Sequence, residues 1–247
     1  MNRGIEAVAT SMKNSEQWLD VVSNNLANVS TNGFKRDGLT FQATLQQVSA
    51  NGGVGNSVGT ISSGTVIANP FSTAGELGPM TPTGNPLDVA IKTPGAMFAV
   101  KDANGQISYT RDGAFSVDAE RNLVTQSNMK VLDDNKNPIQ LPIGQISISP
   151  TGAITAVANG VTTAVGKLGA YTGSFLKSGS NLYADPTGAA STAVANPEFA
   201  AGALEGSNVN PVEAMLDLIK IGRSYELQQK SITQQDQLTQ KLVSTIG

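Results

Sequence analysis

The residues that could do catalytic or metal chemistry are few in this chain. Its 247 residues include no histidine and no cysteine. This excludes serine–histidine and cysteine–histidine nucleophilic sites, zinc fingers, and disulfides. An enzyme with this sequence would have to work with carboxylates, lysine, tyrosine, serine and threonine.

One acidic segment has part of the spacing of a calcium-binding loop. Asp133, Asn135 and Asn137 match the first ligand positions, but Pro138 stands where the loop needs glycine and Gly144 where it needs a bidentate glutamate. The spacing therefore predicts an Asx-rich turn.

Three further candidate sites have simpler interpretations. Asp112 and Asp118 could form a hydrolytic carboxylate pair, but they flank a predicted strand without a companion motif, which favours two solvated turn residues. The glycines at 52–55 lack the Lys-Ser/Thr of a phosphate loop and are interpreted as linker. Asn28-Val29-Ser30 fits a glycosylation sequon but ends a predicted helix. We therefore predict no catalytic residue, metal or cofactor.

Composition also limits the partners. Sixteen basic against 19 acidic residues give a net charge of −3, and charged residues make up only 14%, against about 25% in ordinary domains. This balance favours neither nucleic acid nor an anionic membrane. No stretch approaches the ~20 apolar residues of a membrane helix. The first 20 residues carry Glu6, Glu16 and Asp20 without a continuous apolar run, unlike a cleavable secretory signal.

The elements that would position any site divide the chain. Of the glycines 21 of 26, and of the prolines 10 of 11, fall between residues 37 and 203. The ends are therefore predicted to be helical and the middle to be β structure, an α+β fold. The predicted parts are 1–36 (helix and joint), 37–84 (extended linker), 85–203 (β domain) and 204–247 (helix).

Both predicted helices carry a seam that steps by three and four residues, as in a coiled coil. The first seam consists of Ile5, Val8, Met12, Ser15, Leu19, Val22, Leu26 and Val29. The second consists of Ala214, Leu218, Ile221, Tyr225, Gln228, Ile232, Gln235, Thr239, Leu242 and Ile246. Asn32-Gly33 is expected to end the first helix between Ala27 and Gly33, and Asn210-Pro211 to begin the second.

Such helices, about 40 and 50 Å long, need each other or other chains. A pair within one molecule is one alternative, but the polar positions Ser15, Gln228, Gln235 and Thr239 would make it weak on its own. The polar residues could instead bond to neighbouring subunits, or face solvent or a lumen.

Between the helices, alternation and turn signals predict a series of short strands. They are expected at 87–91, 97–100, 107–110, 114–118, 121–125, 129–132, 145–149, 153–157 and 161–172. Asn159-Gly160 is a hairpin turn signal. Residues 50–86 are rich in glycine, serine, threonine and asparagine, so they are predicted to be extended and ordered by a partner.

Motifs in all three parts carry a family resemblance. The run from Asn24 to Arg36 (NNLANVSTNGFKR) resembles the amino-terminal signature of bacterial flagellar rod and hook proteins, and Leu204–Met215 followed by Arg223–Glu226 resembles the second signature. Residues 85–91 and 109–115 (YTRDGAF) are similar to the β domain of the rod subfamily. Proximal rod proteins look closest, distal rod proteins are the near alternative, and hook proteins are usually longer.

The resemblance implies a structural subunit of the basal-body rod. Family members assemble with copies of themselves and with related axial proteins into a hollow tube in the periplasm, with helices inside and β domains outside. The tube transmits torque and encloses the export channel. It also implies export by the flagellar type III apparatus without signal cleavage, and a chain without cysteine suits that route.

The predicted subunit-interface residues follow from the seams and the joint. They are Ile5, Val8, Met12, Leu19, Val22, Leu26, Phe34, Leu218, Ile221, Tyr225, Ile232 and Leu242. Phe34 is expected to be an apolar anchor that becomes buried only on assembly. A rival class, a carbohydrate-active enzyme or adhesin with Tyr109 and carboxylates at a sugar site, has no need of matched seams at both ends.

Overall fold

The computed structural model describes residues 3–46, 63–72, 75–179, 181–185 and 191–246. The chain forms two compact units. The first, called the helical unit, is built from Met1–Leu26, Asp37–Phe71 and Pro211–Gly247. The second, called the β unit, is built from Ala27–Arg36 and Ser72–Asn210.

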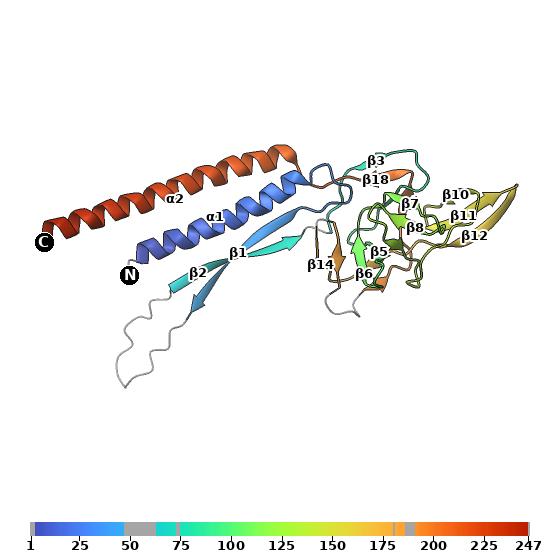
Figure 1. Ribbon diagram of the computed structural model, residues 1–247, viewed down its shortest axis with the longest axis horizontal. Coiled ribbons are helices and arrows are strands. Elements are labelled where there is room, and N and C mark those ends of the chain that lie inside the picture. The colour runs from blue at the N-terminus through green and yellow to red at the C-terminus, as the bar shows by residue number, and fades with distance from the viewer. Residues whose placement is uncertain (1–2, 47–62, 73–74, 180, 186–190, 247) are drawn as a thin grey trace, which may run out of the picture. The chain divides into compact units, whose positions relative to one another are not determined.

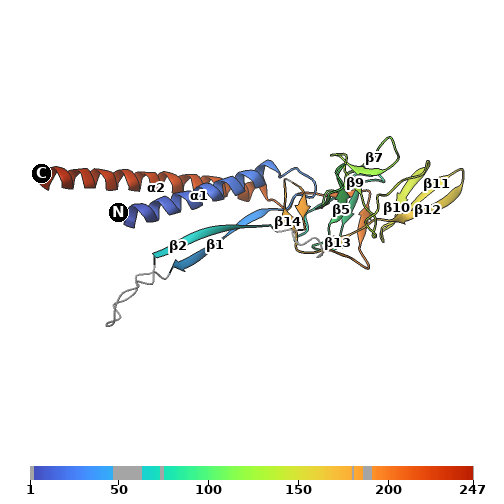
Figure 2. The ribbon, with the colours of Figure 1, turned by 60° about the horizontal axis from the view of Figure 1, so that its bottom comes forward.

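The helical unit contains two long helices and a two-stranded ribbon. Helix α1 spans Arg3–Ala27 and α2 spans Pro211–Ile246, while β1 (Asp37–Gln46) pairs with β2 (Ser63–Ser72). The two helices lie side by side in both ribbon views, and the ribbon runs beside α1 (Figures 1 and 2). Part of the predicted linker is therefore extended, as expected, but paired with itself.

The helix ends lie where the cap signals predicted them. Helix α1 ends at Ala27, and α2 begins at Pro211 with the acidic Glu213 in its first turn, where a carboxylate complements the helix dipole. Among the described residues, neither helix is long and apolar enough to cross a membrane.

The β unit is made of short strands. Those between residues 89 and 172 lie within or next to predicted segments, whereas the strand at 80–82 and those between 176 and 205 were not predicted. Their bounds are β3 (Met80–Pro82), β4 (Val89–Ile91), β5 (Phe98–Lys101), β6 (Ile107–Thr110), β7 (Phe115–Val117), β8 (Leu123–Thr125), β9 (Lys130–Val131), β10 (Gln145–Ile148), β11 (Ala153–Ala158), β12 (Val161–Lys167), β13 (Tyr171–Thr172), β14 (Leu176–Lys177), β15 (Tyr183–Ala184), β16 (Thr192–Ala193), β17 (Phe199–Ala201) and β18 (Ala203–Glu205).

Antiparallel pairing organises these strands. The main sheet has the order β14-β15-β6-β5-β9-β8-β7, and a second has the order β10-β11-β12. The pairs β17-β4 and β18-β3 bring the last strands back beside the first ones of the unit. The chain enters and leaves the β unit through neighbouring strands as a result.

The core of the β unit is aromatic and aliphatic. Phe98 packs edge-on against Phe115 at 5.0 Å between ring centroids and stacks with Phe199 at 6.1 Å. A smaller cluster gathers Met97, Tyr109, Tyr171 and Tyr183 among other buried residues. The few aromatic residues of the chain are thus concentrated where burial contributes most.

Two turn and strand predictions have different outcomes. Asn159 and Gly160 have φ of 51° and 78°, the positive pair typical of a tight hairpin turn, and they join β11 to β12. The single strand predicted at 161–172 is wrong, because it breaks after Lys167 and β13 pairs with β16 instead. Residues 47–62 and 73–74 of the predicted linker lie outside the described residues.

Candidate functional site

The predicted seam of α2 follows its less exposed face. Ala214 and Ile221 are buried, and Leu218, Tyr225 and Ile232 are half-buried. On α1, Val22 is buried, while Val8, Met12 and Leu26 are half-buried and Leu19 remains 37% exposed. The side chains of Ile5 and Leu242 lie outside the described residues.

A polar group in the seam joins the two helices of one chain. The Gln228 amide nitrogen donates to the hydroxyl oxygens of Ser11 at 2.9 Å and Ser15 at 3.2 Å. The same nitrogen also reaches Ser224, one turn away on α2, at 3.2 Å. Gln228 therefore has partners within its own chain.

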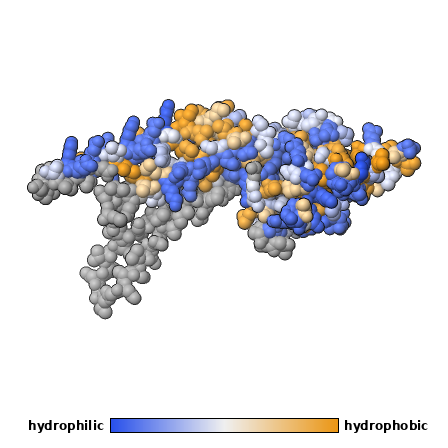
Figure 3. All heavy atoms as spheres, viewed as in Figure 1, coloured by the Kyte–Doolittle hydropathy of each residue, from blue (hydrophilic) through white to orange (hydrophobic). Residues whose placement is uncertain are grey.

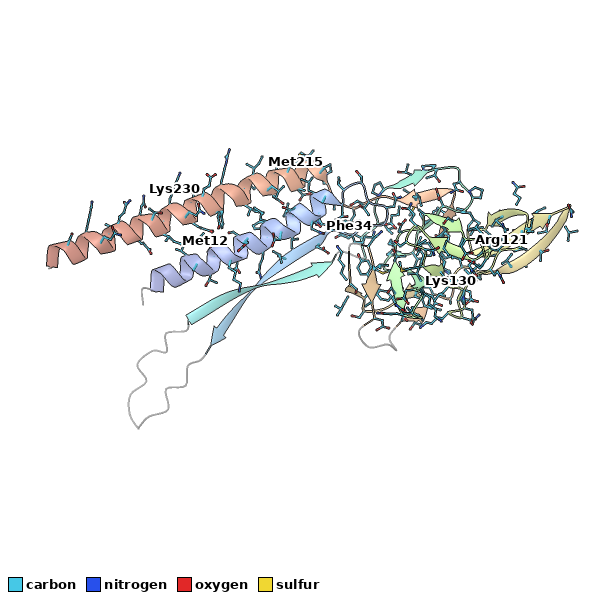
Figure 4. All side chains as sticks on the ribbon, in the orientation of Figure 1. Met12, Phe34, Arg121, Lys130, Met215 and Lys230 are labelled. Atoms are coloured by element: carbon cyan, nitrogen blue, oxygen red, sulfur yellow. The ribbon has the colours of Figure 1, made fainter. Side chains whose placement is uncertain are left out.

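A second apolar face lies at the start of α2. Met215, Leu216 and Ile219 are 53%, 52% and 53% exposed, at a spacing that places them on one side of the helix. The space-filling view shows hydrophobic residues gathered over this end of α2 (Figure 3). Met215 lies on the side of α2 that faces away from α1, as does Lys230 further along (Figure 4).

The segment after α1, which we call the joint (residues 27–36), is held at its base within the helical unit. The Asn25 side-chain amide donates to the Asp37 carbonyl at 2.8 Å and accepts the Asp37 N–H at 2.9 Å. These two bonds bring the residues on either side of the joint together, so the joint is a closed loop.

Gly33 lets the joint pack closely against the rest of the β unit. Its φ is +67°, and a β-carbon there would lie 2.5 Å from the Arg111 carbonyl carbon. Its N–H donates to the Glu205 carbonyl at 2.7 Å. Both the backbone conformation and the lack of space require glycine.

Phe34 is part of the β unit, not an exposed anchor. Its side chain has no exposed surface in the single chain, and the Lys177 ammonium lies 4.1 Å from its ring centroid. The prediction that Phe34 becomes buried only on assembly is therefore wrong. The physical reason is that the joint folds onto its own chain, with the Asn32 carbonyl accepting from Asn181 at 2.7 Å.

The next residue completes a buried ion cluster. The Lys35 ammonium donates to Glu205 Oε1 at 2.5 Å, and the Arg111 guanidinium donates through Nε to Glu205 Oε2 at 2.6 Å, with none of the three side chains exposed. The Gly78 N–H also donates to Glu205 Oε1, at 2.8 Å. One carboxylate thus accepts from three segments that are distant in sequence.

Backbone carbonyls accept further hydrogen bonds from the two cations. Arg111 donates to the carbonyls of Ile91 at 2.7 Å and Thr93 at 3.1 Å, and also to Ala96. Lys35 also donates to the Glu76 carbonyl. Burial lowers the pKa of the Lys35 ammonium from its ordinary value, and the hydrogen bond to Glu205 opposes this shift. Because all three side chains are fully buried, the cluster leaves no space for a substrate and serves to hold segments of the β unit together.

Sequence reasoning did not identify this cluster. Its three charges lie one each in the three motifs that carry the family resemblance: Lys35 after Gly33-Phe34, Arg111 in YTRDGAF, and Glu205 after Leu204. In a chain with only 14% charged residues, the presence of a charged residue in each of the three motifs was the available signal.

The acidic residues considered as candidate sites serve turns. The Asp133 carboxylate accepts the N–H groups of Asn135 at 2.8 Å and Asn137 at 2.7 Å, which confirms the Asx turn. Asp118 accepts the Asn122 N–H at 2.6 Å, and hydrogen bonds from the Asn122 side chain lower its pKa. The Asp112 carboxylate accepts the Ala114 N–H at 3.1 Å. Burial raises the pKa of Asp112, so this residue is less solvated than predicted.

Tyr109, the residue considered for a sugar site, is a core residue. It is 3% exposed, and its hydroxyl lies 2.6 Å from that of Ser191. It cannot line an open binding groove in this fold.

Comparison with known proteins agrees with this architecture. Family models match three parts of the chain: the flagella basal body rod protein model at residues 7–35, the flagellar hook protein FlgE/F/G D1 domain at 90–156, and the flagellar basal body rod FlgEFG protein C-terminal model at 200–245. Two helical ends around a β domain define an axial protein of the flagellar rod and hook class.

Full-length relatives narrow the class. The chain is 37% identical to the flagellar basal-body rod protein FlgF of Caulobacter vibrioides, over 93% of this chain and 91% of the relative. It is 34% identical to FlgF of Escherichia coli (93% and 94% covered) and 34% identical to FlgG of Buchnera aphidicola (91% and 92% covered). The chain therefore belongs to the family of flagellar basal-body rod proteins of the FlgF and FlgG type. Its function is structural and not enzymatic, and it assembles with other rod and hook proteins in the basal body.

Proposed function

We propose that the helical units of successive subunits form a coiled-coil tube around the rod axis, which transmits torque and encloses the export channel. The chain reaches the periplasmic part of the basal body through the flagellar type III apparatus, with its first segment retained as α1. The support for this proposal is the family membership, the seams of both helices and the absence of cysteine.

One observation carries the proposal: α2 has more apolar surface than one chain covers. The seam residues Ala214 and Ile221 are buried within the chain, while Met215, Leu216 and Ile219 on another side stay about half exposed. A contiguous apolar patch on a helix marks a protein contact, and a helix with two apolar sides can pack against two neighbours.

The predicted interface residues divide accordingly. Val22 and Ile221 are already buried in the single chain, so other parts of the same molecule already cover them. Leu19, 37% exposed, and the half-buried Tyr225 and Ile232 retain surface for a neighbouring subunit. We therefore no longer include Phe34 among the proposed subunit-interface residues, and we add Met215 and Ile219.

The test is to introduce a charge on the exposed apolar face. Ile219→Asp should leave the isolated chain folded, because the side chain is already about half exposed. It should nevertheless prevent incorporation into rods and abolish swimming, since an unpaired charge in an apolar contact costs several kcal/mol. Lys230→Asp, at an exposed position on the same side of the helix but outside the apolar patch, is the control for a charge change away from the patch.

Two measurements decide the outcome. Circular dichroism of the purified variants reports the fold, and immunoblots of isolated basal bodies report incorporation. Equal incorporation of Ile219→Asp and Lys230→Asp would refute the assignment of this face as a subunit contact.

A further inference from the structure

The three-stranded sheet of the β unit has two open edges. In the order β10-β11-β12, no other strand is paired to the outer side of β10 or β12 within the part of the chain that the structure describes. The β11–β12 hairpin extends away from the rest of the β unit in both ribbon views (Figures 1 and 2). We call this sheet the arm.

The arm carries no charge before its last residue, Lys167. Residues 137–166 contain no aspartate, glutamate, lysine or arginine. Its surface has exposed aliphatic side chains instead: Ile143 before β10 is 82% exposed, Val161 in β12 is 65% exposed and Val157 in β11 is 38% exposed. The space-filling view shows hydrophobic residues at the outer end of the arm (Figure 3).

Edge strands normally carry features that prevent pairing, such as charges, prolines or bulges. Strand β12 has neither a charge nor a proline before Lys167. Its one irregularity is at Val165, which the register skips between Ala164 and Gly166. Residues 161–164 are therefore a regular and unprotected edge of four residues, the same length as β10 (Gln145–Ile148).

We propose that the arm binds a second copy of this chain by strand pairing, with β12 of one subunit beside β10 of the next. Both β10 and β12 run antiparallel to β11, so they are parallel to each other. If a second copy is placed next to the first in the direction perpendicular to the strands, its β10 pairs in parallel with β12 of the first copy, and the sheet continues from one subunit into the next. The in-sheet register brings Thr162 of one copy beside Gln145 of the next.

The features of the two edges favour a second copy over a charged partner. Both edges are neutral, so pairing brings no like charges together although each chain has a net charge of −3. The contact uses two different surfaces, which is the heterologous arrangement that extends a filament when the rotation between subunits does not close a ring. This inference rests on the proposed rod function and adds a contact made by the β units. Four paired residues are a small interface, so pairing is expected only inside the rod.

Disulfide trapping in assembled rods tests the pairing. Because the chain has no cysteine, the variant Gln145→Cys/Thr162→Cys contains only the two introduced thiols. Within one chain these positions are separated by two strand spacings, about 10 Å, which exceeds the ~7 Å Cα limit of a disulfide. Between neighbours they are expected at about 5 Å. Oxidised basal bodies should then yield covalent dimers and higher multimers on non-reducing gels.

The controls separate this geometry from others. Each single variant, and Asn104→Cys/Thr162→Cys with one thiol moved to an exposed turn, should remain monomeric. Rods that contain the double variant but give no multimers would overturn the pairing while leaving the rod function intact. Dimers from Thr162→Cys alone would also overturn it, since they would indicate β12–β12 pairing.

Charge exchange gives a second measurement that does not depend on oxidation. Gln145→Asp/Thr162→Asp places like charges opposite each other and should reduce rod incorporation at least several-fold. Gln145→Asp/Thr162→Lys should restore it. Equal incorporation of the two variants would overturn the proposal. Failure of the wild-type chain itself to enter rods would instead refute the proposed function.

Discussion

Replacing Glu205 by glutamine should unfold the β unit at a markedly lower temperature. The carboxylate accepts from Lys35 at 2.5 Å, Arg111 at 2.6 Å and the Gly78 N–H at 2.8 Å, with none of the ionic side chains exposed. Glutamine keeps the shape but removes the only anion of the cluster and turns an amide donor toward one of the cations. Two buried cations then lack a counterion.

Removing one partner of a buried ion pair costs about 3–5 kcal/mol. For a domain of 150–250 residues each kcal/mol lowers the melting temperature by about 2–4 °C, so the expected decrease is roughly 6–20 °C. Near-UV circular dichroism is a suitable probe because Tyr109, Tyr171 and Tyr183 are all in the core of the β unit. Glu198→Gln, at an exposed position, should change the stability by less than about 0.5 kcal/mol.

A double-mutant cycle separates the ion pair from simple loss of packing. In a Lys35→Met background, Glu205→Gln should cost less than in the wild type, because only Arg111 remains unpaired. Coupling of about 0.5–3 kcal/mol is expected for residues in direct contact. A melting temperature of Glu205→Gln within 2 °C of the wild type, or additive effects of the two changes, would refute the account of the cluster.

Three further outcomes are expected. Ile232→Asp, at a half-buried seam position, should abolish rod incorporation while the β unit stays folded, whereas Lys230→Asp, at an exposed position, should not. Equal motility of cells carrying the two variants would refute the seam assignment. In dilute monomer, hydrogen-exchange mass spectrometry should show faster exchange of the amides at 5–29 and 212–246 than of those in the β unit, because long helices with weak seams have only marginal stability on their own. Strong protection throughout both helices would favour a stable helix pair within one molecule. Burial raises the pKa of Tyr171 from 10.0 to about 12, so the folded state retains a proton that the unfolded state loses. Stability is then fully present below pH 10 and falls between about pH 10 and 12, and Tyr171→Phe should flatten that decline in pH-dependent melting.

The local structure could be predicted from sequence because local signals specify it. Helix ends follow from Asn-Gly and Asn-Pro steps, strand positions between residues 89 and 172 from alternation and turn signals, and the β11–β12 turn from Asn159-Gly160. The pairing of β1 with β2 could not be predicted, since long-range strand pairs leave no mark in segments rich in small polar residues. Phe34 was misassigned for a related reason. An apolar residue after a helix needs burial, but its sequence does not say whether its own chain or a neighbour supplies it.

The buried cluster also joins segments through which the chain passes from one unit to the other. The chain crosses between the two units after residues 26, 36, 71 and 210. Lys35 lies just before the second crossing, the Glu76 carbonyl and Gly78 N–H follow the third, and Glu205 precedes the fourth. Glu205 therefore ties three of the four crossing segments together on the β unit, and Arg111 fixes that tie to the core through the Ile91 and Ala96 carbonyls. Under the proposed function, a force on any one of these segments would be distributed to the others through hydrogen bonds to a single carboxylate.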